Sequence, residues 1–329
     1  MDAKQLKMRG LFFFFLTLPF IGFSQYDFNF PRDTSFNVQS AYRKIAKDFP
    51  QANIVEEFNN PTINEKRNLV YHSFGKRELH IDVFYPKISK MKLAPGVLLI
   101  HGGGWASGTK SHLVPMAQKL AEAGYVAAAV EYRLSPEAKY PAGVIDLKTA
   151  LKWLRIHAND FGLDTSRIAT LGTSAGATLA SLVGTTGGNS LYLSHPQDQA
   201  VSDKVQAIVN MDGVLDFTDP IESGKDNDPA KPSAGARWFG ATYKQKPELW
   251  IEASPLTYVS DKTPPTLFVN SALPRFHAGR EDYLAVLNKH GIYNEVLTIK
   301  ETPHPYWLFH PWFDEAVPLI ISFLDKVLK

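Results

Sequence analysis

The sequence predicts an α/β fold, with a mostly parallel twisted sheet and helices on both faces. Short apolar runs alternate with helical patterns along most of the chain, which is typical of parallel strands buried on both sides. A serine between two glycines follows one apolar run and precedes a run of small residues, which indicates a sharp strand-to-helix turn. The chain has 329 residues, of which 44% are hydrophobic, so it can bury one large core.

The expected elements follow one another along the chain. Residues 79–85 alternate apolar and polar side chains, which predicts a half-exposed antiparallel strand. Continuous apolar runs predict five buried strands, at residues 97–100, 126–130, 167–171, 205–211 and 266–270. Helical patterns between them fall at residues 112–123, 142–157 and 175–184. The last strand is expected at residues 293–299 and the closing helix at residues 312–327.

Two glycine-rich motifs indicate a nucleophilic site. Residues 172–176 have the form Gly-x-Ser-x-Gly of a nucleophile elbow, which exposes the hydroxyl of Ser174 above the sheet. Residues 101–105, His-Gly-Gly-Gly-Trp, also end a strand, and their glycines free backbone N–H groups to face a developing oxyanion. Either motif alone is a weak signal. Two motifs in this order, each after a strand, predict the site of a serine hydrolase.

A serine nucleophile needs a base. Hydrolases of this architecture have the chain order Ser, acid, His, which places the histidine in the loop after the last strand. His304 lies in that loop and is the predicted base. His310 lies nearer the last helix and is the alternative. A packing or capping role is the non-catalytic interpretation of His304.

With these motifs the chain resembles the carbohydrate-esterase-like branch of the α/β-hydrolase superfamily, which is related to hormone-sensitive-lipase-type esterases. Further matching stretches are 131–134 (Glu-Tyr-Arg-Leu), 140–142 (Tyr-Pro-Ala), 164–168 (Asp-Thr-Ser-Arg-Ile), 253–255 (Ala-Ser-Pro) and 264–266 (Pro-Pro-Thr). The resemblance covers roughly residues 79–325. It implies the α/β-hydrolase fold, ester hydrolysis without a cofactor or metal, and backbone amides of Gly103, Gly104 and Ala175 as oxyanion donors.

The chain departs from this family at the triad acid. Relatives carry His-Gly-x-x-Asp after the seventh strand, whereas Pro274 stands here where the Asp is expected. Asp212 directly follows the preceding strand and is the favoured replacement, because an adjacent strand end is the simplest new source of a carboxylate. The other candidates are Asp282, Glu281 and Asp216, and a Ser–His dyad without an acid is the remaining alternative.

Cationic and aromatic residues are expected around the site. Arg275, His277 and Arg280 lie in the loop that replaces the usual acid loop. Forked guanidinium groups there would recognise a substrate carboxylate such as that of a uronic acid, or would form internal salt bridges. Trp105 and Trp307 adjoin the site motifs and are candidates for lining a sugar pocket, although large aromatic residues also serve burial.

The chain is expected to have three parts. Residues 1–24 have the basic start, short apolar stretch and small residue of a secretory signal peptide, and the apolar stretch is short for a bilayer span of about 20 residues. Residues 25–66 are expected to form a loosely structured arm with a helix near residues 38–47. Residues 67–329 are expected to form the α/β-hydrolase catalytic domain. Residues 219–258 interrupt the alternation of strands and helices in this domain and predict a short cap insertion.

Charge and cysteine content limit the partners and the compartment. Without residues 1–24 the chain has 32 basic and 32 acidic residues, which argues against nucleic acid as a partner. The chain has no cysteine, so an exported protein of this kind fits the periplasm or the medium of a bacterium. We expect no stable membrane insertion after signal cleavage.

Together these observations predict an exported serine esterase. It would remove acetyl, methyl or feruloyl esters from a plant-type polysaccharide or oligosaccharide, such as pectin or xylan, through an acyl-enzyme. One alternative is a small-molecule esterase or lipase without sugar preference. The other is a non-catalytic binding protein on the same fold.

Overall fold

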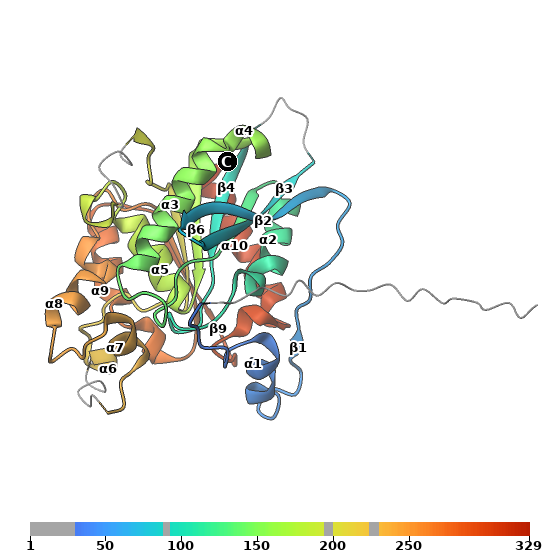
Figure 1. Ribbon diagram of the computed structural model, residues 1–329. Helices are drawn as coiled ribbons and strands as arrows, with labels where there is room; N and C mark the ends of the chain where they lie inside the picture. Colours follow the sequence, from blue (N-terminus) through green and yellow to red (C-terminus); the bar gives the residue numbers. More distant parts are fainter. Residues whose placement is uncertain (1–29, 88–92, 194–199, 224–229) are drawn as a thin grey trace, which may run out of the picture. The chain divides into compact units, whose positions relative to one another are not determined.

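An eight-stranded sheet forms the centre of the protein. The computed structural model describes residues 30–87, 93–193, 200–223 and 230–329, and the predicted signal peptide at 1–24 lies outside the described residues. The strands, in spatial order, are β2 (Ile63–Phe74), β3 (Arg77–Pro86), β5 (Val126–Val130), β4 (Ala94–Ile100), β6 (Leu163–Thr173), β7 (Ala207–Met211), β8 (Thr266–Ser271) and β9 (Asn294–Ile299) (Figure 1). The predicted mostly parallel sheet is confirmed, since β3 pairs antiparallel with β2 and β5 and the other pairings within this sheet are parallel.

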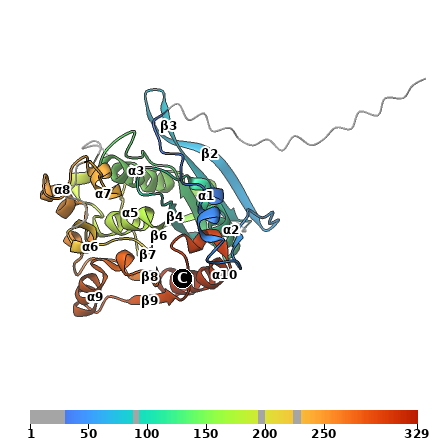
Figure 2. The same cartoon turned by 90° about the horizontal axis from the view of Figure 1, so that it is seen from below.

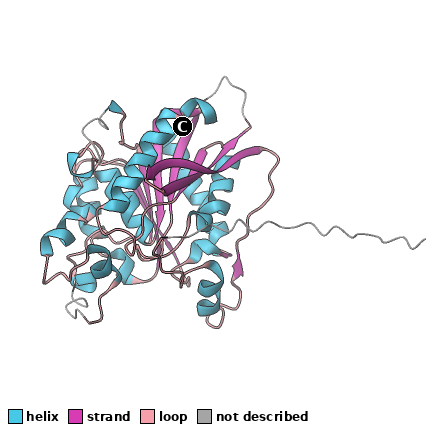
Figure 3. Cartoon of the chain, viewed as in Figure 1, coloured by secondary structure: helices cyan, strands magenta, loops and turns pink. Residues whose placement is uncertain are grey.

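Helices cover both faces of this sheet. Leu98 and Ile100 of β4 pack with α3 (Ala142–Ile156) and α5 (Ala175–Thr185), whereas Val97 and Leu99 pack with α2 (Val114–Glu122) and α10 (Trp312–Leu328) (Figures 2 and 3). Side chains that alternate between two apolar layers explain why the central strands read as continuous hydrophobic runs. Over the described ranges, no helix has the length and hydropathy that crossing a bilayer requires.

Shorter elements complete the fold. Helix α9 (Arg280–Lys289) packs Tyr283 and Leu287 against Phe268 of β8. Other short helices are η1 (Lys110–Leu113), α4 (Ala158–Phe161), η2 (Ser190–Tyr192), η5 (Pro274–His277) and η6 (Tyr306–Leu308). Because the parallel strands share one orientation, the loops that follow β6, β7, β8 and β9 meet at the same edge of the sheet.

The predicted arm at residues 25–66 differs from the structure. The compact unit begins at Arg32, and the boundary at residue 67 falls inside β2. The expected helix is present as α1 (Val38–Ile45), where Asn37 and Ser40 cap each other's backbone N–H groups at 2.9 Å. Strand β1 (Asn53–Ile54) pairs with β10 (Phe309–His310). Strand β2 could not be recognised in the sequence because it is an edge strand without a continuous apolar run. The Asn, Glu, Lys and Arg side chains at its start are at least partly exposed.

The described parts of the insertion at residues 219–258, which are 219–223 and 230–258, contain short helices. They are α6 (Pro220–Ser223), α7 (Ala234–Phe239), α8 (Pro247–Glu252) and η4 (Pro255–Tyr258). Trp238, Phe239 and Trp250 are buried and join the core layer on the α3 and α5 side of the sheet. The insertion is therefore packed on the domain through an aromatic cluster, and burial is the main role of these three side chains.

Candidate active site

Ser174 lies on a strained turn between β6 and α5. Its backbone has φ 52° and ψ −124°, a region that non-glycine residues rarely adopt and that costs about 1–3 kcal/mol. Gly172 and Gly176 permit this turn, because a Cβ at Gly172 would overlap the carbonyl of Gly176, and a Cβ at Gly176 would overlap the carbonyl of Ile100. The backbone N–H of Ser174 donates to the carbonyl of Met211 at 2.8 Å, which ties the turn to β7. The predicted elbow geometry is therefore present.

Ser174, His304 and Asp212 form one hydrogen-bonded chain. Oγ of Ser174 lies 2.7 Å from Nε2 of His304, and Nδ1 of His304 lies 3.0 Å from Oδ2 of Asp212. Asp212 is fully buried, whereas the side chain of His304 is 25% exposed. With the proton on Nδ1 donated to Asp212, the lone pair of Nε2 faces the hydroxyl of Ser174. The contacts expected from the sequence for these three residues are thus present, and the arrangement suits proton transfer from the serine.

The carboxylate of Asp212 is oriented by the end of β8. Its Oδ1 accepts the backbone N–H of Ser271 at 2.7 Å and the side-chain amide of Asn270 at 3.4 Å. This leaves Oδ2 to face His304. The carboxylate also acts on Tyr306, whose pKa is held well above its usual value, first by burial and then by electrostatic interaction with Asp212. Its hydroxyl stays protonated and donates to the carbonyl of Val269 at 2.8 Å.

The other candidates for the triad acid contact other partners. Oδ1 of Asp216 accepts from the backbone N–H and the hydroxyl of Thr218, at 2.8 and 2.7 Å. Glu281 pairs with Arg280 at 2.7 Å. Glu281 and Asp282 both lie in the first turn of α9, and both are exposed to solvent. None of the three makes the contact with the imidazole that Asp212 makes.

The alternative base, His310, also has a different partner. Its Nδ1 lies 2.6 Å from Oδ2 of Asp314, and the two side chains are 40% and 62% exposed. His304 is therefore the histidine that the structure places at Ser174.

The glycine motif at residues 101–105 lies against the elbow. The backbone N–H of Gly102 donates to Oγ1 of Thr173 at 3.2 Å, and a Cβ on Gly102 would lie 2.9 Å from Cβ of Ser174. Gly103 and Gly104 have φ of 125° and 59°, which glycine adopts without strain. Among the described residues, none accepts a hydrogen bond from the N–H of Gly103 or Gly104. Ala175 opens α5, where first-turn N–H groups have no partner within the helix. These three N–H groups are available to an oxyanion.

A buried histidine holds the start of this motif. Nδ1 of His101 lies 2.8 Å from the carbonyl oxygen of Gly102, and its ring stacks on Tyr132 with 4.6 Å between centroids. Burial is the largest influence on this histidine and lowers its pKa to about 3, so the ring is neutral at physiological pH. His101 supports the loop, a role that the sequence analysis did not assign although the residue belongs to the motif.

The two tryptophans near the site are buried. Trp105 is 6% exposed and stacks on Trp238 of the insertion, with centroids 4.8 Å apart and planes 6° apart. Trp307 is 3% exposed and meets the ring of His304 edge-on at 5.2 Å. The predicted use of both residues as sugar-stacking surfaces is not supported by this burial, because neither ring offers a free face. Both rings instead pack beside the residues of the site.

The three cationic residues of the loop after β8 are engaged within the chain. Nε and Nη2 of Arg275 contact the two carboxylate oxygens of Glu222 at 2.7 and 3.2 Å. Arg280 pairs with Glu281, and its Nη1 donates to Oδ1 of Asn270 at 2.9 Å. Nε2 of His277 lies 2.9 Å from the carbonyl oxygen of Ser271. Of the two interpretations of the arginines, these contacts favour internal salt bridges.

A residue that the sequence analysis missed also lies at the site. The ring of Phe276 stacks on the ring of His304 with centroids 3.6 Å apart and planes 5° apart. A phenylalanine in a polar loop carries no sequence signal for such a contact, because the stacking depends on how two loops distant in the sequence meet.

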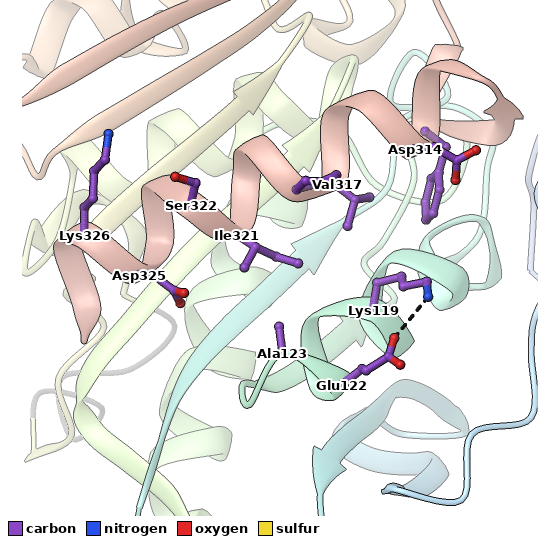
Figure 4. Close-up of a pocket in the computed structure, with 11 residues that line it drawn as sticks. Lys119, Glu122, Ala123, Asp314, Val317, Ile321, Ser322, Asp325 and Lys326 are labelled. Carbon is purple, nitrogen blue, oxygen red and sulfur yellow. Dashed lines mark hydrogen bonds and ion pairs between the residues drawn. The ribbon is translucent and has the colours of Figure 1, made fainter.

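A groove lies elsewhere on the protein, between α2 and α10 (Figure 4). It has a volume of about 940 Å³ and is lined by Lys119, Glu122, Ala123, Phe313, Asp314, Val317, Pro318, Ile321, Ser322, Asp325 and Lys326. None of the site residues lines it. Within the part of the chain that the structure describes, no group of three or more His, Asp or Glu side chains is arranged to hold a metal ion.

Known proteins share both sequence and fold with this chain. "Probable carboxylic ester hydrolase LipM" of Mycobacterium tuberculosis is 29% identical over 245 residues, which cover 73% of this chain and 53% of the relative. The chain thus spans about half the length of the curated relatives it matches. Solved structures also share the fold. A truncated carbohydrate esterase from gut microbiota has a TM-score of 0.70 at 20% identity and covers 82% of this chain and 100% of its own.

The second structure is an acetyl ester-xyloside bifunctional hydrolase from Caldicellulosiruptor lactoaceticus. Its TM-score is 0.64 at 23% identity, over 77% of this chain and 89% of its own. The predicted α/β-hydrolase fold is confirmed by these similarities. The family model described as BD-FAE matches residues 81–273. Because this match spans more than half of the chain, the protein belongs to the BD-FAE family of the α/β-hydrolase superfamily.

Proposed function

We propose that the protein is a carboxylic ester hydrolase that works through an acyl-enzyme on Ser174. The observation that carries this proposal is the chain of hydrogen bonds from Ser174 Oγ through His304 to the buried carboxylate of Asp212. A serine on an elbow turn, an imidazole within hydrogen-bonding distance of it and a buried carboxylate behind the imidazole are the groups that nucleophilic acyl transfer requires.

The first half of the reaction forms the acyl-enzyme. Oγ of Ser174 attacks the ester carbonyl carbon while Nε2 of His304 takes the hydroxyl proton. The carbonyl oxygen becomes an oxyanion, which the N–H groups of Gly103, Gly104 and Ala175 stabilise. Asp212 stabilises the imidazolium that forms. When the intermediate collapses, the bond to the alkoxy oxygen breaks and His304 returns the proton to the leaving alcohol.

The second half restores the enzyme. Water attacks the acyl carbon, and His304 takes a proton from it. Collapse of this second intermediate breaks the bond to Ser174 Oγ, which recovers its proton from His304. The products are one carboxylic acid and one alcohol, so the ester and a single water molecule account for every atom.

We further propose that the substrate is a sugar ester carrying acetyl, methyl or feruloyl groups, exposed on a plant-type polysaccharide or oligosaccharide. Two proteins with this fold are named as a carbohydrate esterase and an acetyl ester-xyloside hydrolase, which supports this substrate class. The pairing of Arg275 and Arg280 within the chain favours neutral sugars, as in xylan, over the uronic acids of pectin. Export remains part of the proposal and rests on the signal-like sequence of residues 1–24.

A small-molecule esterase without sugar preference is the second candidate. It is favoured by the names of the relatives, which include esterases and a carboxylesterase without mention of sugars. A non-catalytic binding role would not require the strained Ser174 turn or the alignment of His304 and Asp212, so the site argues against it.

One substrate panel tests these proposals. Wild type and Ser174→Ala are incubated with p-nitrophenyl acetate, acetylated xylan, acetylated and methylated pectin, and feruloylated arabinoxylan, and release of p-nitrophenol, acetate, methanol and ferulate is measured. The sugar-ester proposal predicts a higher kcat/KM on at least one polysaccharide or its oligomers than on p-nitrophenyl acetate. Activity on p-nitrophenyl acetate alone supports the second candidate. No release from any substrate by the wild type would refute the esterase proposal.

A further inference from the structure

Phe276 and Trp307 enclose the imidazole of His304. Phe276 covers a face of the ring at 3.6 Å between centroids, nearly parallel, and Trp307 meets the ring at 5.2 Å and 89°. A face contact and an edge contact together leave the ring few orientations. The catalytic base is therefore packed by aromatic residues in addition to its hydrogen bonds.

The hydrogen bonds of His304 alone do not fix the plane of its ring. They hold the ring at two atoms, Nδ1 toward Asp212 and Nε2 toward Ser174. Both contacts are made at the ends of the line that joins the two nitrogens, so they resist a shift of the whole ring perpendicular to its plane only weakly. Such a shift carries Nε2 away from the serine hydroxyl. A contact on the face of the ring opposes a shift toward that face, and Phe276 provides it.

Phe276 is itself held through the neighbouring residue. Arg275 binds both carboxylate oxygens of Glu222, at 2.7 and 3.2 Å, and its guanidinium carbon lies 5.7 Å from the centre of the Phe276 ring. Glu222 belongs to α6 of the insertion and is 8% exposed. A two-point contact between a guanidinium and a carboxylate fixes both direction and distance. The loop that carries Phe276 is thus fastened to the insertion.

The same loop is fastened to the segment after β7. The backbone N–H groups of Leu215 and Asp216 donate to the carbonyl of Ala278 at 2.9 and 3.3 Å. Gly279, at φ 76°, lies so close that a Cβ would be 2.5 Å from Cβ of Asp216. The loop therefore has little freedom to withdraw from His304.

We propose that Phe276 is a positioning residue that holds the plane of the His304 ring, and that the Glu222–Arg275 ion pair keeps Phe276 in place. This inference rests on the proposed esterase function. It gives the insertion at residues 219–258 a part in catalysis, because Glu222 acts on the base through Arg275 and Phe276. Small errors in the placement of a catalytic group, of about 1 Å, can lower rates by about 10²-fold.

The ring of Phe276 is tested with two substitutions. Phe276→Leu keeps an apolar side chain but removes the flat face, and Phe276→Tyr keeps the face. kcat and KM are measured separately on p-nitrophenyl acetate, and thermal unfolding is recorded for each variant. We expect Phe276→Leu to lower kcat by about 10-fold or more with KM nearly unchanged, since His304 serves both halves of the reaction. Phe276→Tyr should retain the wild-type kcat.

The ion pair is tested with Glu222→Gln, and the matched control is Glu122→Gln, which alters the surface pair of Glu122 with Lys119 at 3.0 Å. Glu222→Gln should lower kcat without changing KM, and Glu122→Gln should change neither. Combined with Phe276→Leu, Glu222→Gln should add no further loss, because both substitutions act on the same contact. If Phe276→Leu fails to fold, kcat of Glu222→Gln and of Phe276→Tyr still tests whether Phe276 positions the ring of His304.

Several results would overturn the inference. They are a wild-type kcat in Phe276→Leu, an equal loss in Phe276→Tyr, a rise in KM without a fall in kcat, or additive losses in the double variant. The proposed function fails separately, if Ser174→Ala keeps the wild-type rate. An inactive Ser174→Ala together with a fully active Phe276→Leu would refute only the role of Phe276.

Discussion

Oδ2 of Asp212 lies 3.0 Å from Nδ1 of His304, although Asp212 follows β7 and His304 follows β9. Strand β8 runs between these two strands, and its last residue, Ser271, donates its backbone N–H to the other oxygen of Asp212 at 2.7 Å. The intervening strand therefore supports the acid without supplying it. This arrangement completes the hydrogen-bonded chain even though Pro274 stands where the resemblance places the carboxylate.

Asp212→Asn should lower kcat by about 10³–10⁴-fold with little loss of folded protein, because the amide cannot stabilise the imidazolium or hold the same tautomer. The measurement is kcat on p-nitrophenyl acetate, with thermal unfolding as the folding check. The matched control is Asp216→Asn, in the same segment, which should keep the wild-type kcat. Equal losses in both variants, or a greater loss at Asp216, would exclude Asp212 as the acid.

The variants His304→Ala and His310→Ala should have very different values of kcat. Removal of the base should cost about 10⁴-fold or more in kcat. His310 contacts Asp314 on the exposed surface at 2.6 Å, so its removal should leave kcat unchanged. Steady-state kinetics of both variants on the same ester provide the comparison. A large loss at His310 with activity preserved at His304 would reverse the assignment.

The mostly parallel sheet and the main site were predictable from sequence for a physical reason. Strands buried on both faces appear in the sequence as continuous apolar runs. Because parallel strands end at the same edge of the sheet, reactive residues that follow different strands are expected to lie near one another. Ser174, Asp212 and His304 each follow a strand of the sheet, so their proximity could be expected from topology, although the choice of Asp212 over Asp282, Glu281 and Asp216 needed the structure. The stacking of Phe276 on His304 could not, because it depends on the path of a loop fastened by Arg275.

The burial of individual side chains could not be predicted from the sequence either. Trp105 lies in a site motif, but whether its ring faces substrate or protein depends on Trp238, which belongs to an insertion far along the chain. Strand β2 was missed because an edge strand with exposed polar residues lacks the apolar pattern that identifies buried strands. Both errors come from contacts between segments that are distant in the sequence.

Arg275→Met and Arg280→Met should not change the preference between acidic and neutral substrates. Both guanidinium groups contact partners within the chain, and Arg280 also holds the amide of Asn270 toward Asp212. We therefore expect kcat to fall on both substrate types together. The measurement is the ratio of kcat/KM for acetylated pectic oligomers to that for acetylated xylan oligomers. A 10-fold fall in this ratio, equivalent to about 1.4 kcal/mol, would show that the arginines bind a substrate carboxylate.

Stability should fall as the pH is lowered below about 6.5. Burial lowers the pKa of His101 to about 3 and that of His112 to about 4, from an ordinary value of 6.5. Between these values the unfolded chain binds protons that the folded chain does not, so acid favours unfolding, by up to about 1.4 kcal/mol per pH unit for each proton. Urea unfolding between pH 7.5 and 4.5 measures this slope.

His112→Gln removes one of these buried groups and should make the slope shallower. The matched control is His290→Gln, at an exposed position, which should keep the wild-type slope. A slope in His112→Gln as steep as in the wild type would contradict a contribution from His112.

The central claim is that Ser174 is a nucleophile activated by His304, and it is tested most directly by locating a covalent adduct. The protein is treated with an alkyl p-nitrophenyl phosphonate, which forms a stable bond to an activated serine, and the labelled residue is identified by peptide mass spectrometry. We predict one label per chain, on Ser174, with no labelling of Ser174→Ala and strongly slowed labelling of His304→Ala. A label on another residue, or unchanged labelling of Ser174→Ala, would contradict this account.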